Sequence, residues 1–459
     1  MKAIDLVIKG GTLINASEVI EADIGISDEK IALIGKNLEG KEIIDAGGLY
    51  VLPGAVDPHV HLEMPAGITT SSDDWQSGSI AAACGGTTTL IDFVEPENNQ
   101  SLREAYMLRR QQAENKSVLD FGLHMTITNS EQNTLSQLPD LIEQGITSFK
   151  LYTTYTGFKL DDTQLLKVLN AIHKLEALAI VHSENDAIIQ WRTQDLLKTD
   201  LNNPASHPLS RPETAEREAI HRILSLAEIT RAFVYIVHIS TRQGAEMVCH
   251  ARLRGQKAFG ETCPQYLLLD HSLYQQPDFE GAKFVCSPPL RKKSDTRALW
   301  QALSNGTIQV AATDHCPFFF KGQKDLGKDN FSKIPGGLPG VGLRLSLMYS
   351  YGVCGGHLSL NRWVETCSTA AARLFGLYPR KGCLLPGADA DIVLFDPHKI
   401  LTVRKDILHE NVDYTPYEGM QLKGYPVMTI KGGKPIAKDG TFLDTKITGK
   451  YLARKLPDC

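Results

Sequence analysis

The chain has 459 residues, of which 42% are hydrophobic, and a formal net charge of −5 at pH 7. This length allows a large core, and this charge gives no global attraction to nucleic acid or to anionic membranes. No stretch reaches the roughly 18 consecutive apolar residues of a membrane-spanning helix, and the start, MKAIDLVIKGG, lacks the apolar core of a secretion signal.

The nine cysteines are scattered and form no Cys-x-x-Cys pair. Several, such as Cys84, Cys286 and Cys316, lie in apolar runs. This is typical of reduced, buried thiols and not of a disulfide framework. We therefore expect a cytoplasmic protein with no nucleic-acid or membrane partner.

Both ends of the chain show short strands divided by turn residues. Near the N-terminus these runs are 4–8, 12–15, 23–26, 30–34 and 42–45, and near the C-terminus they are 390–395 and 427–430. The string Ile-Lys-Gly-Gly occurs at 8–11 and again at 430–433. We expect one small β-sandwich domain from residues 1–53 and 385–440, followed by a tail, 441–459, that contacts another subunit.

Between the ends, strands alternate with helices. The predicted strands are 51–58, 87–93, 120–126, 146–152, 178–182, 233–239, 257–261 and 308–313. The predicted helices are 75–84, 101–115, 133–144, 162–176, 213–230, 241–253, 293–305 and 360–376. Continuously apolar strands separated by helices indicate a parallel sheet covered on both faces. Eight repeats favour an α/β fold of the (β/α)₈ barrel type over residues 54–384, with long loops at 186–212 and 316–343.

The first barrel strand leads into Asp57-Pro58-His59-Val60-His61. Side chains alternate along a strand, so His59 and His61 point the same way and can meet one metal ion. The alternative is one packed and one solvent-facing histidine. An open doubly wound sheet would carry a Gly-rich phosphate turn at this place, and His-x-His occupies it instead.

Chemistry in a barrel collects at the C-terminal ends of the strands. Those predicted ends carry His59, His61, Lys150, His182, His238 and Asp314. Of the other histidines, His124 is expected in the core and His315 beside the site. The remainder are expected at the surface: His173, His207, His221, His250, His271, His357, His398 and His409.

Lys150 is the unusual member, because an ammonium group does not bind metal. A buried lysine near cations has a lowered pKa, and its neutral amine can add carbon dioxide. The carbamate formed is an anionic ligand suited to bridging two metal ions about 3.5–4 Å apart. The alternative is a structural lysine paired with Asp314.

Several segments together resemble the cyclic amidohydrolases, and most closely their dihydropyrimidinase/hydantoinase branch. The resemblance covers nearly the whole chain. Its segments are DPHVH at 57–61, GGTTT at 85–89, FKLY at 149–152, VH at 181–182, VHIS at 237–240, ETCPQY at 261–266, SPPLR at 287–291, ATDH at 312–315 and PGADAD at 386–391.

The resemblance implies two divalent metal ions per subunit, with zinc as the usual metal and manganese or iron as alternatives. The first ion would be held by His59, His61, Asp314 and Lys150 in its carboxylated form, N6-carboxylysine. The second ion would share Lys150 with His182 and His238. The resemblance also implies a homotetramer.

The resemblance assigns catalytic roles as well. Asp314 would take a proton from the attacking hydroxide and deliver it to the leaving ring nitrogen. Tyr155, five residues after Lys150, would donate a hydrogen bond to the developing oxyanion, or else be a core aromatic. Ser287 and Gly336 would bind the ring through the main chain. Relatives usually have Asn at the position of Gly336.

The expected reaction is hydrolysis of 5-substituted hydantoins or dihydropyrimidines to N-carbamoyl amino acids. Glu63 argues against dihydroorotase, because it would repel a substrate carboxylate. An apolar pocket for the ring substituent is expected from Met64, Pro65, Ile68, Tyr152 and Phe158. The alternatives are an allantoinase and a non-catalytic, dihydropyrimidinase-related scaffold protein, which would lack metal ligands.

Overall fold

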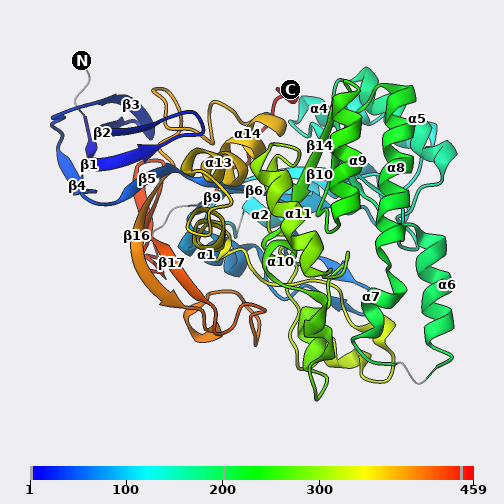
Figure 1. The fold of residues 1–459 in the computed structure, drawn as a ribbon. Helices are drawn as coiled ribbons and strands as arrows, with labels where there is room; N and C mark the ends of the chain where they lie inside the picture. The colour runs from blue at the N-terminus through cyan, green and yellow to red at the C-terminus, as the bar shows by residue number, and fades with distance from the viewer. Residues whose placement is uncertain (1–3, 115, 200–201, 445–447, 459) are drawn as a thin grey trace.

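The computed structural model describes residues 4–114, 116–199, 202–444 and 448–458. Two bodies are visible in Figure 1, a curved sheet of blue and orange strands and a larger body of strands and helices. No helix in the described ranges has both the length and the apolar character needed to cross a lipid bilayer.

The curved sheet has nine strands and takes them from both chain ends. Its order is β19-β18-β17-β16-β5-β1-β2-β3, with β4 paired to β1. We propose that this sheet defines the small domain of residues 1–53 and 385–440, although β19 extends the sheet two residues further. The strands are β1 (Leu6–Ile14), β2 (Val19–Ser27), β3 (Lys30–Gly35), β4 (Glu42–Asp45), β5 (Tyr50–Pro53), β16 (Ile392–Thr402), β17 (Gln421–Lys431), β18 (Lys434–Lys438) and β19 (Thr441–Phe442).

The larger body contains eight parallel strands in the order β15-β14-β13-β12-β11-β10-β9-β6. The ring closes where the His61 N–H donates to the His315 carbonyl at 2.8 Å. The predicted (β/α)₈ barrel with a second β unit from both chain ends is confirmed. Its strands are β6 (Ala55–Val60), β9 (Thr87–Val94), β10 (Asp120–Thr126), β11 (Ser148–Tyr152), β12 (Leu178–His182), β13 (Phe233–Ile236), β14 (Ala258–Thr262) and β15 (Val310–Ala311).

Buried polar groups reinforce this closure. The Thr313 hydroxyl donates to Asp57 at 2.7 Å, and Arg344 donates to the carbonyls of Val56 and Ala311 at 3.0 Å each. Both Asp57 and Arg344 are buried. The first and last barrel strands are therefore held together just below the ends that carry the histidines and Asp314.

Helices cover the barrel, and α5 shows why they form where they do. It begins with a capping box between Asp161 and Gln164, and it buries Leu165, Val168, Leu169 and Ile172 on one stripe. The helices are α1 (Trp75–Cys84), α2 (Leu102–Glu114), α3 (Gln132–Leu135), α4 (Leu138–Glu143), α5 (Asp162–Lys174), α6 (Asp186–Leu196), α7 (Ser206–Ser210), α8 (Glu213–Thr230), α9 (Arg242–Leu253), α10 (Pro264–Leu268), α11 (Lys293–Ser304), α12 (Arg344–Leu347), α13 (Leu360–Val364) and α14 (Ala370–Leu374).

Several predicted segments differ from the structure, and the predicted helix 133–144 is two helices, α3 and α4. The run 51–58 is two strands, because the chain changes sheets at Gly54, where a Cβ atom would lie 2.1 Å from the Thr88 hydroxyl. Residues 186–212 are not one long loop, since Asn185 caps α6 by accepting from the Ile188 N–H. The last helix is interrupted by a π-helical turn between α13 and α14.

Residues 448–458 of the tail lie against the barrel of their own chain, whereas residues 441–442 form β19 of the curved sheet. Leu452 donates from its N–H to the Phe121 carbonyl at 2.8 Å and is buried. The Lys455 N–H donates to Gly376, whose φ is +69° and where a Cβ atom would lie 1.8 Å from the Lys455 carbonyl. The expected contact of the tail with another subunit stays a prediction.

A buried charge cluster joins the start of barrel strand β10, at Asp120, to the curved sheet. Lys381 lies 2.6 Å from both Asp120 and Asp391 and 3.0 Å from Asp389, and Lys431 lies 2.8 Å from Asp120. Burial by itself disfavours the charged forms of Asp120 and Lys381. The neighbouring lysines nevertheless hold the pKa of Asp120 below its usual range, and the neighbouring aspartates hold the pKa of Lys381 above its usual range. Each charge is therefore retained only because its partners are present.

We expect Lys381→Met to destabilise the protein by about 3–5 kcal/mol at pH 7, because it leaves buried carboxylates unpaired. This destabilisation should become smaller below about pH 4. A carboxylate whose pKa is lowered by folding stabilises the folded protein at pH values above the pKa of the unfolded chain, and this stabilisation is lost as the pH falls further. Thermal midpoints at pH 7 and at a series of pH values from about 4 down to about 2 measure both effects. Lys434→Met, at an exposed position on β18, is the control, and equal midpoints for the two variants at pH 7 would contradict the account.

Candidate metal centre

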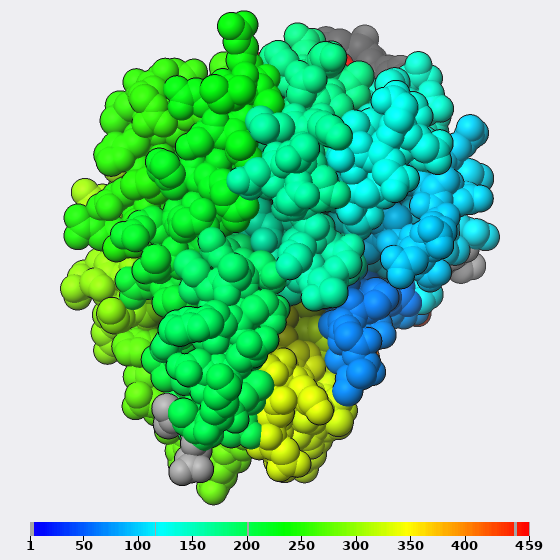
Figure 2. Space-filling view, turned by 90° about the vertical axis from the view of Figure 1, so that its right-hand side faces the viewer, coloured from blue at the N-terminus to red at the C-terminus, as the bar shows by residue number. Residues whose placement is uncertain are grey.

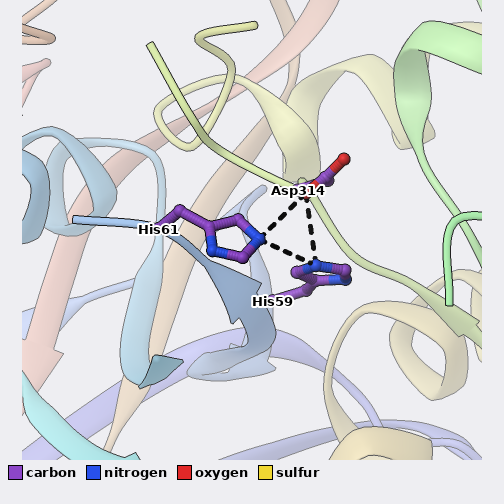
Figure 3. Close-up of side chains that lie close together, drawn as sticks. All are labelled: His59, His61 and Asp314. Carbon is purple, nitrogen blue, oxygen red and sulfur yellow. Dashed lines mark hydrogen bonds and ion pairs between the residues drawn. The ribbon is translucent and has the colours of Figure 1, made fainter. Parts of the chain in front are cut away.

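Three predicted ligands converge at the C-terminal end of β6. His59 and His61 lie with their Nε2 atoms 3.2 Å apart, and these atoms lie 3.2 and 3.4 Å from the Asp314 carboxylate. All three side chains are buried and point toward one another (Figure 3). Their donor atoms lie within 4.8 Å of one another, a spacing that can hold one metal ion.

The other predicted ligands lie beside this group. Lys150 is on β11, His182 ends β12, and His238 follows β13 by two residues; all are buried. The ring centroids of His182 and His238 are 4.5 Å apart, and those of His59 and His238 are 5.5 Å apart. The six candidate ligands therefore occupy one end of the barrel.

Lys150 lies in an environment that disfavours its charge. Its Nζ atom is 4.7 Å from the Phe93 ring centre and 5.1 Å from that of Tyr152. Burial lowers the pKa of Lys150 to about 8, although Asp314 and Glu261 act in the opposite direction. Among the described residues Asp314 forms ion pairs with His59 and His61 and none with Lys150, so a structural Lys150–Asp314 pair is not formed.

The backbone is strained at this end of the barrel. Tyr155, His238 and Asp314 have φ angles of 75°, 39° and 52°, in the left-handed region that non-glycine residues rarely adopt. Such conformations persist only where the surroundings impose them, and they concentrate at functional sites. Three of the residues that the sequence predicted for the site therefore lie in such conformations.

Two buried glutamates support the histidines and were missed from sequence. Glu261 lies 2.6 Å from His59 Nδ1 and accepts from the Tyr235 hydroxyl at 2.8 Å. Glu184 lies 2.9 Å from His182 Nε2. Hydrogen bonds of this kind orient metal-binding imidazoles. The available signal was a glutamate at the end of an otherwise apolar strand, and Glu261 is such a residue.

Arg211 connects one of these glutamates to Tyr155. Its guanidinium donates to Glu184 at 2.5 Å and lies 5.4 Å from the Tyr155 ring centre. Burial raises the pKa of Tyr155 to about 12, against the lowering effects of Arg211 and Ser287. The phenol therefore keeps its proton at neutral pH and is a hydrogen-bond donor.

Ser287 and Gly336, both predicted to bind substrate, are neighbours. A Cβ atom on Gly336 would lie 3.0 Å from the Ser287 hydroxyl and 3.7 Å from its main-chain nitrogen. A larger side chain at Gly336 would therefore press on Ser287. The two main-chain segments form one surface beside Tyr155, whose pKa responds to Ser287.

A cavity of about 150 Å³ adjoins His61. It includes the predicted Met64 and Pro65 but also the carboxylates of Asp92, Glu95 and Glu97. Its lining is thus less apolar than the sequence suggested. Ile68 is 82% exposed, and the rings of Tyr152 and Phe158 are 5.4 Å apart. Figure 2 shows a hollow where the green α6–α7 segment, yellow residues of 316–343 and blue residues after β6 meet.

Two sequence interpretations change. Glu63 pairs with Lys116 at 2.5 Å, so it would repel a substrate carboxylate less than an unpaired glutamate would.

His207, expected at the surface, is buried and lies 2.8 Å from the Cys286 carbonyl. His124 and His315 are buried, and His315 lies 2.9 Å from Asp73.

The residues fit a metal site. Two imidazoles and one carboxylate are a donor set typical of zinc and of similar divalent ions. His238 Nδ1 is buried without a hydrogen-bond partner among the described residues, a costly arrangement that a further ligand would relieve.

The comparisons with known proteins agree with this geometry. The model of the amidohydrolase family matches residues 50–436. The chain is 45% identical to D-hydantoinase of Geobacillus stearothermophilus over 451 residues, which covers 97% of this chain and 96% of the relative. It is 42% identical to D-phenylhydantoinase of Escherichia coli over 455 residues, or 98% of both chains.

A crystal structure of dihydropyrimidinase from Brevibacillus agri superposes with a TM-score of 0.97 at 41% identity, covering 98% of this chain and 99% of that one. The matches extend over the barrel and over both chain ends. Together with the His-His-Asp group they indicate divalent-metal binding. This chain therefore belongs to the amidohydrolase family, in its hydantoinase and dihydropyrimidinase branch.

Proposed function

We propose that this protein hydrolyses the cyclic amide bond of 5-substituted hydantoins, and of dihydropyrimidines, giving N-carbamoyl amino acids. The observation that carries the proposal is the buried group of His59, His61 and Asp314 at the end of β6. Full-length similarity to D-hydantoinases and to a dihydropyrimidinase supports the substrate class and preference for the D enantiomer.

Two divalent ions, zinc or alternatively manganese or iron, are proposed for this site. His59, His61 and Asp314 would hold the first, His182 and His238 the second, and Lys150 as N6-carboxylysine would be shared. Bound ions supply Lewis acidity, which polarises the amide carbonyl and lowers the pKa of water. The lowered pKa of Lys150 supports formation of the carbamate, since only a neutral amine adds carbon dioxide.

The chain's own residues would carry the remaining chemistry. Asp314 would accept a proton from the attacking water and pass it to the ring nitrogen as the amide bond breaks. Tyr155 would donate its phenolic proton in a hydrogen bond to the oxyanion. Ser287 and Gly336 would align the ring through their main-chain groups. A main-chain contact needs no side chain, so glycine at position 336 can make it.

We also propose an assembly and a location for the protein. The exposed apolar side chains of Ile229 on α8 and Leu253 on α9, 78% and 79% accessible, support a subunit contact on that face and thus a homotetramer. The eight described cysteines are all unpaired, which supports a cytoplasmic location.

Turnover of racemic 5-phenylhydantoin by enzyme prepared with zinc and bicarbonate tests the proposal. We expect N-carbamoyl-D-phenylglycine as the product, with a kcat/KM at least about 100-fold above that for allantoin. Dihydrouracil is compared in the same assay. Turnover of allantoin alone would make the protein an allantoinase, and turnover of none of the three with metal bound would favour the scaffold alternative.

A further inference from the structure

Lys324 is a fully buried lysine in the segment 316–343, which borders the hollow of Figure 2. Its Nζ atom donates to the Val285 carbonyl at 2.8 Å and to the Pro335 carbonyl at 3.0 Å. No described carboxylate pairs with it. Burial lowers the pKa of Lys324 to about 7. A lysine buried without an acidic partner is costly, and such residues are retained mainly where they have a task.

Both carbonyls belong to the segments that carry the proposed substrate contacts. Val285 lies two residues before Ser287, and Pro335 immediately precedes Gly336. The Val285 carbonyl also accepts the Gly337 N–H at 3.0 Å. Lys324 therefore completes a junction between two main-chain segments, 285–287 and 335–337, which are far apart in sequence and lie side by side.

The junction has little freedom to move. A Cβ atom on Gly337 would lie 2.3 Å from the Cys316 carbonyl, so this segment passes tightly against the chain that follows Asp314. His207 lies 2.8 Å from the Cys286 carbonyl and holds the residue between Val285 and Ser287. With its two hydrogen bonds, Lys324 sets the spacing between Ser287 and Gly336.

We propose that Lys324 is a positioning residue for substrate, which fixes the distance between the Ser287 and Gly336 main chains that read the ring amides. This inference rests on the proposed function, because it assigns Lys324 to recognition of the same cyclic diamide. Among the described residues Lys324 forms no hydrogen bond or ion pair with a candidate metal ligand, so its effect should fall on substrate binding and not on metal content.

The test is Lys324→Met, which keeps the aliphatic length and removes the donors. We expect KM for unsubstituted hydantoin and for 5-phenylhydantoin to rise together by about tenfold or more, because the junction reads the ring and not the substituent. Metal content should equal that of the wild type, and kcat should change by less than about threefold. Lys321→Met, at an exposed position three residues away, should behave as the wild type.

A folded Lys324→Met protein with wild-type KM would overturn the inference, as would a loss of activity in proportion to lost metal. If this variant does not fold, Lys324→Gln, whose shorter side chain cannot donate to both carbonyls as Nζ does, is measured in the same way. A raised KM in that variant supports the inference and a wild-type KM overturns it. Wild-type enzyme that turns over no hydantoin would instead refute the proposed function.

Discussion

Lys150→Ala is expected to lower kcat/KM for 5-phenylhydantoin by at least about 10³-fold, since several kcal/mol of transition-state stabilisation depend on the metal site that Lys150 is proposed to complete. Its Nζ atom lies beside the rings of Phe93 and Tyr152 and forms no ion pair with Asp314. The variant removes the only amine that the six candidate ligands contain. Steady-state kinetics and metal analysis on the same preparation measure the effect.

Chemical rescue separates the carbamate from a structural role. Acetate or propionate can supply the missing carboxylate in the space that the alanine leaves, so we expect partial recovery of activity with added acid. Lys174→Ala, at an exposed position on α5, serves as the control and should remain unaffected. Full activity of Lys150→Ala without added acid would rule out the carbamate.

Asp314→Asn is the second variant with a large expected effect. Burial by itself raises the pKa of Asp314, but His59, His61 and Lys150 hold it below its usual range, so the group is an anion at neutral pH. Asparagine has nearly the same shape but cannot accept and return a proton. We expect kcat to fall by about 10³-fold, the range of general acid–base catalysis.

Pre-steady-state and steady-state rates together with metal content measure this loss. Asp329→Asn, at an exposed position in the segment 316–343, is the matched control. A kcat within threefold of the wild type at full metal content would show that Asp314 moves no proton in the rate-limiting step.

Much of the fold could be predicted because its strands are continuous apolar runs. Helices 162–176 and 213–230 were placed to within two residues, since a 3.6-residue apolar period marks both and a capping box marks the start of the first. The division at Gly54 was not predictable from hydrophobicity, because the apolar run of residues 49–56 continues across it. Helix α6 was missed because its face is only partly buried, with Trp191 65% exposed.

The candidate ligands could be predicted because each stands at a strand end, where the barrel brings distant residues together. Their supporting groups could not. Glu261 meets His59 across 202 positions, and Lys324 meets Val285 across 39. Likewise the charge of Glu63 is meaningful only with its partner Lys116, 53 residues away. Partnerships of this kind depend on the fold, and no local pattern encodes them.

The measurement that most directly tests metal-dependent hydantoin hydrolysis combines metal content and turnover in one titration. Chelated, inactive enzyme is supplied with zinc in stepwise amounts, with bicarbonate present, while 5-phenylhydantoin hydrolysis is followed. The account predicts that activity appears with metal and reaches its maximum at two ions per chain. Full activity in the metal-free enzyme, or two bound ions with no hydrolysis, would contradict it.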